Sequence, residues 1–306
     1  MMASPAPILI AGTGAMACLF AARISAAGMP VAMLGTWLEG LDALQQHGVR
    51  IIEAGGQEQA YPVRVITDPR SCQNLPFALV LVKSWQTRRT ALQLSECLAP
   101  DGLALTLQNG AGNRETLAQT LGVQRVALGS TTTGAHLHAP GVVQPAGEGV
   151  ITLGIHPRLK PLSDVLRKAG FIVETAPDLN ILLWGKLVIN AAINPITALL
   201  RAPNGALLER PAARSLMTAV AREAASVAIA KGVHLPYPDP AVAVETIARR
   251  TGDNYSSMLQ DVLRGAPTEI DAINGWIVQA GEATNVPTPL NRTLWQLIQA
   301  LSPQQE

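Results

Sequence analysis

Charged and aromatic residues are scarce in this chain of 306 residues, at 15% and 4% of the sequence. Disordered chains combine low hydrophobicity with high charge, so a chain that is 48% hydrophobic is expected to fold. The 23 basic and 22 acidic residues almost balance, which leaves a net charge of +1. We therefore expect no nucleic-acid partner, because binding to a phosphate backbone depends on a basic surface.

Cysteine is also rare. Cys18, Cys72 and Cys97 are the only three and form no C-x-x-C pair, which excludes a disulfide scaffold. An odd number of unpaired thiols is typical of a reduced, cytoplasmic protein. His136 and His138 have no Cys or carboxylate beside them, so we expect no metal site.

Two apolar stretches are long enough to raise the question of a membrane segment. The first, 8–22, is interrupted by two glycines, and the residues before it lack the Lys or Arg of a signal peptide. The second, 181–200, has the length of a bilayer span but contains a lysine, two asparagines and a proline. Unsatisfied polar groups are costly in lipid, so we expect neither stretch to cross a membrane.

The two halves of the chain differ in their periodicity. In the first half, apolar runs predict strands at 8–11, 31–34, 77–82 and 103–107, with helices at 15–27 and 86–98. This alternation indicates a mostly parallel sheet covered on both faces. Segments 49–52 and 61–66 flank Gly55-Gly56 and predict a hairpin.

Beyond residue 178 the pattern is helical. Helices are expected at 179–200, 213–231, 240–252, 269–284 and 291–301. We therefore predict an α/β protein with a Rossmann-like dinucleotide-binding domain over 1–176. An all-α domain over 177–306 is expected to follow it.

The first predicted strand leads into a glycine loop, Gly12-Thr13-Gly14-Ala15-Met16-Ala17, which fits G-x-G-x-x-A. In this pattern Gly12 makes a tight turn, Gly14 lets the backbone approach a pyrophosphate, and Ala17 lets the helix pack closely. The helix N-terminus then offers N–H groups to the phosphates. An ordinary strand-to-helix turn is the alternative, but the position between a strand and a helix favours nucleotide binding.

The end of the second predicted strand bears on the choice of dinucleotide. NAD enzymes usually carry Asp or Glu there, and NADP enzymes an Arg nearby. This chain has Gly35-Thr36-Trp37. Without a carboxylate nothing repels a 2′-phosphate, and Thr36 can hydrogen-bond to it. We therefore predict NADPH, with NAD left open.

Lys186, Asn190 and Asn194 recur every four residues in an otherwise apolar helix. Such residues line one face, which we call the polar ridge. The alternative is a solvated stripe, but so narrow a ridge favours a site, since buried polar groups need partners. Desolvation would make Lys186 a ready proton donor. Pro195 is expected to kink or restart the helix.

These motifs together resemble the ketopantoate reductase (2-dehydropantoate 2-reductase) family, in order and over nearly the whole chain. The ridge and the block S-S-M-x-x-D…E-I-D-x-x-N-G are specific to it. The matching segments are the glycine loop, Lys83-Ser84-Trp85-Gln86, Gln108-Asn109-Gly110-Ala111-Gly112, Trp184-Gly185-Lys186-Leu187-Val188-Ile189-Asn190 with Asn194-Pro195, Pro203-Asn204-Gly205, Ser256-Ser257-Met258-Leu259-Gln260-Asp261 and Thr268-Glu269-Ile270-Asp271-Ala272-Ile273-Asn274-Gly275.

The resemblance implies reduction of 2-dehydropantoate to pantoate with NADPH, on the route to pantothenate and coenzyme A. Lys186 would donate the proton, and Glu269 would lie near the cofactor ribose and this lysine. Glu269 has a simpler alternative role, as an acid at a helix N-terminus. Implied substrate-binding residues are Asn109, Lys186, Asn190, Asn194, Asn204 and Ser257. Implied cofactor-binding residues besides the glycine loop are Lys83, Asn109, Ala135 and Glu269, to which the strand-end argument adds Thr36.

Two competing functions remain at this point. One is reduction of another 2-keto acid, and the other is an NADP-sensing regulator without activity. A regulator would not need Lys186, Asn190, Asn194, Ser257 and Glu269 together, so an enzyme is favoured. Many family members carry Arg where this chain has Gly35-Thr36-Trp37. The expected partners are a small 2-keto acid and a second copy in a homodimer.

Overall fold

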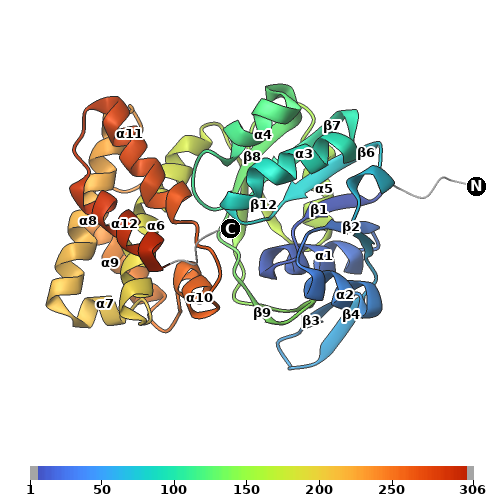
Figure 1. The fold of residues 1–306 in the computed structure, drawn as a ribbon, viewed down its shortest axis with the longest axis horizontal. Helices are drawn as coiled ribbons and strands as arrows, with labels where there is room; N and C mark the ends of the chain where they lie inside the picture. The colour runs from blue at the N-terminus through green and yellow to red at the C-terminus, as the bar shows by residue number, and fades with distance from the viewer. Residues whose placement is uncertain (1–5, 302–306) are drawn as a thin grey trace, which may run out of the picture. The chain divides into compact units, whose positions relative to one another are not determined.

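The computed structural model describes residues 6–301, which form two compact units (Figure 1). The first runs to Gln108 and resumes over Asn113–Leu179; the second comprises Asn109–Gly112 and the chain from Asn180 onward. The boundary at Leu179 lies a few residues after the expected one at 176. The separate assignment of Asn109–Gly112 was not predicted, because it depends on contacts with residues far along the chain.

An eight-stranded sheet forms the centre of the first unit, in the order β12-β11-β8-β7-β6-β1-β2-β5. All neighbours are parallel except β8 and β11. The mostly parallel α/β prediction is therefore confirmed. The strands are β1 Ile8–Ala11, β2 Val31–Leu34, β5 Arg64–Ile66, β6 Leu75–Val80, β7 Leu98–Thr106, β8 Val126–Thr131, β11 Val150–Gly154 and β12 Ile172–Ala176.

Helices cover both faces of this sheet. Ile8 and Ile10 of β1 pack in one core with the first and fifth helices, while Leu9 between them packs in a second core with the third and fourth. Successive strand side chains point to opposite faces, so a strand buried on both sides is apolar throughout. These helices are α1 Ala15–Ala26, α3 Thr87–Cys97, α4 Asn113–Leu121 and α5 Lys160–Lys168, and α2 Leu38–His47 follows β2.

A smaller sheet has the order β4-β3-β10-β9, with β3 Val49–Ile52, β4 Glu58–Tyr61, β9 Ala135–Ala139 and β10 Val142–Pro145. The expected hairpin around Gly55-Gly56 is present, but the expected extent of its second strand, 61–66, is wrong. Strand β3 pairs with Glu58–Tyr61, and Arg64–Ile66 instead join β2 in the large sheet. Pro62 separates the two strands because it has no N–H to continue a ladder.

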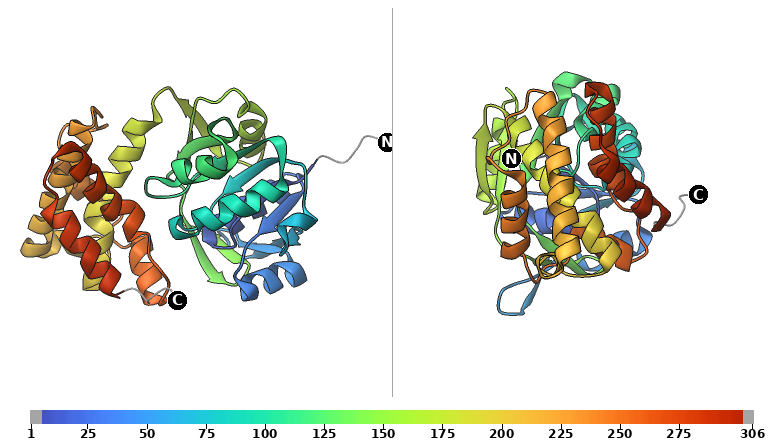
Figure 2. Two further views of the ribbon diagram at one scale, coloured as in Figure 1. Left: turned by 45° about the horizontal axis from the view of Figure 1, so that its top comes forward. Right: turned by 90° about the vertical axis from the view of Figure 1, so that its left-hand side faces the viewer.

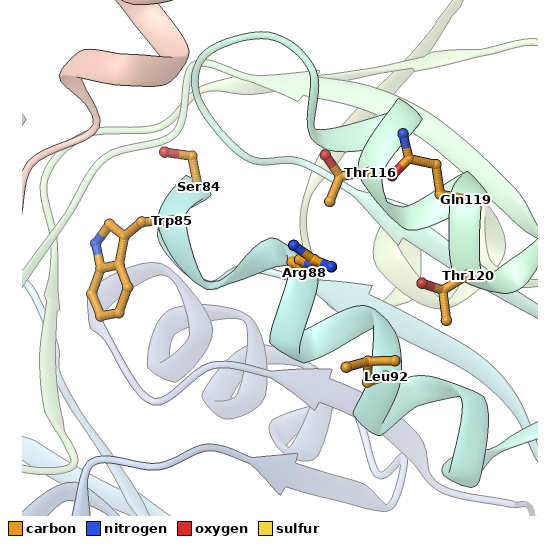
Figure 3. Close-up of a pocket in the computed structure, with 7 residues that line it drawn as sticks. All are labelled: Ser84, Trp85, Arg88, Leu92, Thr116, Gln119 and Thr120. Carbon is orange, nitrogen blue, oxygen red and sulfur yellow. The ribbon is translucent and has the colours of Figure 1, made fainter. Parts of the chain in front are cut away.

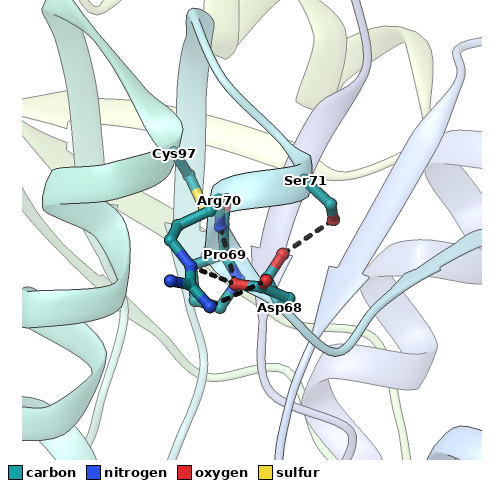
Figure 4. A network of polar contacts seen from close by, with 5 residues as sticks. All are labelled: Asp68, Pro69, Arg70, Ser71 and Cys97. Atoms are coloured by element: carbon teal, nitrogen blue, oxygen red, sulfur yellow. Dashed lines mark hydrogen bonds and ion pairs between the residues drawn. The ribbon is translucent and has the colours of Figure 1, made fainter.

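The connection from β5 to β6 is fixed by local hydrogen bonds (Figure 4). The Asp68 carboxylate accepts from the backbone and guanidinium N–H groups of Arg70, and the Ser71 hydroxyl donates to the Asp68 carbonyl. The Cys97 thiol donates to the Pro69 carbonyl at 3.3 Å. Burial raises the pKa of the Cys97 thiol to about 12. This thiol therefore stays protonated at neutral pH and is a poor nucleophile.

The second unit is largely helical and packs around α6 (Figures 1 and 2). By length and hydropathy Asn180–Leu200 could span a membrane, but 67% of its apolar window is buried inside the protein, so it is a core helix. The elements are α6 Leu179–Leu200, α7 Ala206–Glu209, α8 Pro211–Ala230, α9 Pro240–Arg250, α10 Ser257–Leu263, the π-helical turn η4 Asp271–Gly275, α11 Trp276–Thr284 and α12 Pro289–Leu301.

Two expectations for this unit need correction. Of the kink or restart expected at Pro195, the restart is wrong, because helix α6 continues through this residue to Leu200. Pro195 has no N–H to donate to the Ala191 carbonyl. That carbonyl instead accepts a hydrogen bond from the Asn274 side chain at 3.1 Å. The single helix expected over 269–284 begins as a π-helical turn. Hydrophobic periodicity does not reveal such a turn, because it adds one residue to a single helical turn.

Candidate active site

Gly12 is fixed as glycine by its backbone and its neighbours. Its φ is +129°, and a Cβ there would lie 3.1 Å from the Leu81 carbonyl oxygen and 3.2 Å from the Ala17 Cβ. The Gly12 N–H donates to the Leu34 carbonyl of β2 at 2.7 Å. The tight turn and the close packing of Ala17 inferred from the sequence are therefore both present.

Gly14 differs from Gly12 because a Cβ there would meet no atom within 4 Å. Gly14 is the N-cap of α1, no side chain caps this helix, and its first turn contains no acidic residue. The first N–H groups of α1 thus face a space that a negatively charged group can enter. These features fit the pyrophosphate of a dinucleotide.

Thr36, just after β2, accepts a hydrogen bond on Oγ1 from Nη2 of Arg89 at 2.9 Å. The sequence around this strand end contains no arginine. In the folded protein, however, α3 places Arg89 beside it, although Arg89 lies 53 residues further along the chain. No local pattern around Gly35-Thr36-Trp37 could have revealed it. An exposed guanidinium beside the strand end is suited to a ribose 2′-phosphate.

Lys83 follows β6 and precedes the short turn η2 Ser84–Gln86. Its backbone N–H donates to the Gln86 side chain at 3.3 Å, which fixes the start of α3. Ala135, the other expected cofactor contact, is half-buried at the start of β9. The cofactor roles of both residues stay predictions.

A hollow of about 650 Å³ lies between α3 and α4 (Figure 3). Arg88 is the only charged residue that lines it, so the hollow suits a neutral or anionic group better than a cation. The other lining residues are Ser84, Trp85, Leu92, Thr116, Gln119 and Thr120.

The loop Asn109–Gly112 packs on the π-helical turn η4 within the helical unit. The Ala111 N–H donates to the Ala272 carbonyl at 2.9 Å. Gly110 has a φ of +79°, and a Cβ there would lie 2.7 Å from that same carbonyl oxygen. A Cβ on Gly112 would lie 2.8 Å from the Trp276 ring. Asn109 is thereby held at the start of a loop in which positions 110 and 112 favour glycine.

The polar ridge is intact, because α6 runs unbroken through all three of its members. Lys186 and Asn190 are half-buried, and Asn194 is 6% exposed. Burial lowers the pKa of Lys186 from 10.5 to about 8, and the negative charge of Glu269 acts in the opposite direction. The structure therefore brings Lys186 and Glu269 into the same environment, with Glu269 itself 5% exposed.

The turn of α6 that carries Lys186 is covered by the segment before α9. A Cβ on Gly185 would lie 2.7 Å from the Pro236 ring, so only glycine lets this segment pack so closely. The Tyr237 hydroxyl donates to the Gly185 carbonyl at 3.0 Å. This packing buries Gly185, the residue directly before Lys186, and no sequence motif had indicated it.

Ser257 begins α10, next to a buried hydroxyl pair. Ser256 accepts from the Leu259 N–H at 3.1 Å as the N-cap, and its Oγ lies 2.7 Å from the Thr197 Oγ1. This contact ties the start of α10 to the last turns of α6. Ser257 is half-buried at that helix start.

Some of the polar groups of Asn204 form hydrogen bonds within the fold. Its Nδ2 donates to the Thr251 hydroxyl at 2.8 Å, and its backbone N–H donates to the Asn254 carbonyl. Its Oδ1 is buried without a hydrogen-bond partner, as is the Thr268 hydroxyl next to Glu269. Such acceptors are normally satisfied, so both atoms are candidates for contact with a ligand or water.

Among residues 6–301, no three His, Cys, Asp or Glu side chains gather in an arrangement that could hold a metal ion.

Comparison with known proteins gives a consistent picture. The family model "Ketopantoate reductase PanE/ApbA" matches residues 8–158, and the model of its C-terminal domain matches 178–302. A 2-dehydropantoate 2-reductase of Archaeoglobus fulgidus is 36% identical over 96% of this chain and 97% of its own length.

Solved structures agree in fold. A ketopantoate reductase family protein of Ralstonia eutropha JMP134 superposes with a TM-score of 0.90 at 32% identity, covering 96% of this chain and 98% of that one. D-Mandelate dehydrogenase with NADH and anilino(oxo)acetate has a TM-score of 0.90 at 24% identity, again covering 96% and 98%. At that identity the second match concerns the fold alone.

The two loop glycines give a matched pair of variants. Gly12→Ala should destabilise the fold by about 1–3 kcal/mol, because it adds a side chain at positive φ against Leu81. Gly14→Ala should leave stability within about 0.5 kcal/mol, since its site is open. It should still weaken the binding of a nicotinamide dinucleotide roughly tenfold or more, because a methyl would fill the space open to a phosphate. Urea unfolding and fluorescence titration measure the two effects, and undiminished binding by Gly14→Ala would refute the phosphate site.

Proposed function

The chain belongs to the ketopantoate reductase family, and within it we propose that the protein reduces 2-dehydropantoate (ketopantoate) to pantoate with NADPH, in the synthesis of pantothenate and coenzyme A. The observation that carries this proposal is Lys186, whose pKa burial lowers to about 8, on one helix face with Asn190 and Asn194. No metal is needed, because the lysine itself supplies the acid.

Lys186 supplies the proton in this reaction. A nicotinamide held beside these residues would supply a hydride to the substrate's C2 carbon, and the carbonyl oxygen would then carry the negative charge that the proton of Lys186 neutralises. With a pKa near 8, Lys186 is mostly protonated at pH 7 and still releases its proton readily to that oxygen. The Glu269 charge raises the lysine pKa and so keeps the proton in place until it is needed.

Ketopantoate carries a carboxylate, a ketone and a hydroxyl, so it needs both donors and acceptors. The amides of Asn190 and Asn194 provide both kinds of group along the ridge. The Nδ2 of Asn204 is engaged by Thr251, so this residue offers its unpartnered Oδ1 as an acceptor for the substrate hydroxyl. Ser257, at the start of α10, adds a hydroxyl, and Asn109 contacts both substrate and nicotinamide.

NADPH is the cofactor we favour. The glycine loop accommodates the pyrophosphate, and Arg89 with Thr36 binds the 2′-phosphate. Lys83, Ala135 and Glu269 complete the proposed cofactor contacts. NADH is the alternative, since the structure of D-mandelate dehydrogenase contains it.

Three free cysteines among the described residues support a reducing, cytoplasmic location. A homodimer formed through the helical unit stays a prediction from the family resemblance.

Reduction of a different 2-keto acid is the second candidate function. The same fold occurs in D-mandelate dehydrogenase, so the fold by itself does not determine the keto acid. The test follows NADPH oxidation with ketopantoate and with other branched and aromatic 2-keto acids. We expect ketopantoate to give the highest kcat/KM. A higher kcat/KM for another acid would make that acid the substrate in place of ketopantoate. No turnover of any acid would refute the proposal that the protein is a reductase.

Lys186→Met should lower kcat by roughly 10²–10⁴-fold, the usual range for loss of a general acid. Its Kd for NADPH should change little. Lys231→Met, at the exposed end of α8, is the control. A near-normal kcat in Lys186→Met would show that the proton comes from elsewhere.

In the unaltered protein kcat/KM should be level below pH 8 and fall about tenfold per pH unit above it, because only the protonated amine of Lys186 donates.

Arg89→Ala should raise KM for NADPH roughly 10–100-fold, the range for losing a hydrogen bond to a charged group. KM for NADH should stay within about twofold of normal, because NADH has no 2′-phosphate. Arg88→Ala removes the same charge one residue earlier on the same helix and should have little effect. Equal losses with both cofactors would contradict the assignment of Arg89.

A further inference from the structure

Pro195 creates a specific problem within α6. In an α-helix the N–H of each residue bonds to the carbonyl four residues earlier, so residue 195 should serve Ala191. Proline has no N–H, and its ring crowds that carbonyl. The helix nevertheless continues from Leu179 to Leu200. The Ala191 carbonyl therefore needs another donor, because the residue is fully buried.

Asn274, in the π-helical turn η4, supplies that donor. Its Nδ2 donates to the Ala191 carbonyl at 3.1 Å and to the Asn291 Oδ1 at 3.0 Å, and its side chain is fully buried. The Ala191 carbonyl can only accept, which fixes the orientation of the Asn274 amide. The asparagine thus replaces the hydrogen bond that Pro195 removes.

Asn274 is itself held by a second buried amide. The Nδ2 of Asn291 donates to the Glu223 carboxylate at 2.9 Å, which orients its Oδ1 toward Asn274. The same carboxylate accepts from the backbone N–H groups of Leu290 and Asn291 at the start of α12. The chain of contacts from Glu223 to Ala191 therefore joins α8, α12, η4 and α6.

The position of Ala191 gives this contact its significance. Ala191 follows Asn190 directly and precedes Asn194 by three residues, so along the helix it lies between these two members of the polar ridge. On the far side of Asn194, the Thr197 hydroxyl is hydrogen-bonded to Ser256 beside Ser257. The segment that carries both ridge amides is thus anchored at each end by a buried side-chain contact.

We propose that Asn274 is a positioning residue, which sets the substrate-facing amides of Asn190 and Asn194 by replacing the helical hydrogen bond lost at Pro195. It does not touch the substrate. This assignment rests on the proposed function for the roles of Asn190 and Asn194, while the repair of α6 does not depend on it.

The test is a double-mutant cycle of Asn274→Leu and Pro195→Ala. Alanine restores an N–H at residue 195, so α6 no longer needs the donor from Asn274. With Pro195 present, Asn274→Leu should raise KM for the 2-keto acid at least about tenfold, with Kd for NADPH within about threefold of normal. In the Pro195→Ala background the same change should raise KM less than about threefold.

Amide hydrogen exchange of α6 in the cofactor-free full chain gives a readout without any substrate. Asn274→Leu should speed exchange around Ala191–Thr197 at least tenfold with Pro195 present, and far less when Pro195→Ala is also made. If no 2-keto acid is turned over, the proposed function fails and exchange alone decides this inference. Equal effects in both backgrounds would overturn it. If the leucine variant does not fold, Asn274→Ser, which leaves room for water, is measured in the same cycle.

Discussion

Holding the amine of the half-buried Lys186 against an apolar helical core is the constraint on which the rest of the helical unit depends. Burial favours the neutral amine and lowers the pKa of Lys186 to about 8. A surface helix would leave that pKa near 10.5, so the lowered value depends on α6 being a core helix. The elements packed on it follow from this requirement: Glu269 supplies compensating charge, and Pro236 and Tyr237 close the turn beside Gly185.

Core burial in turn demands that every polar group on α6 have a partner. The Ala191 carbonyl receives Asn274, and Thr197 pairs with Ser256. Both partners belong to the block of sequence that also carries Ser257 and Glu269. The two motifs are thus coupled physically: one lies on a helix that contains a proline, and the other supplies the hydrogen bond that this proline removes. The first unit provides something simpler: open space at Gly14 and N–H groups at the start of α1 that no side chain caps.

Features that depend on neighbouring residues could be predicted from the sequence. The turn at Gly12, the packing of Ala17 and the four-residue spacing of Lys186, Asn190 and Asn194 each follow from local geometry. Contacts between distant segments could not be predicted, because no local pattern encodes them. Arg89 reaches Thr36 from another helix, and Ala111 donates to Ala272 across more than half the chain. The strand break at Pro62 was visible in the sequence, but which sheet each half would join was not.

The most direct test of this account is the titration of the Lys186 amine itself, followed by NMR of its side-chain methylene in the cofactor-free protein, with Lys186→Met used to assign the signal. The account predicts a pKa near 8, and a still lower value in Glu269→Gln, because the negative charge that raises it is then gone. A pKa near the 10.5 of an exposed lysine, unchanged in Glu269→Gln, would contradict the claim that burial on α6 makes Lys186 the proton donor.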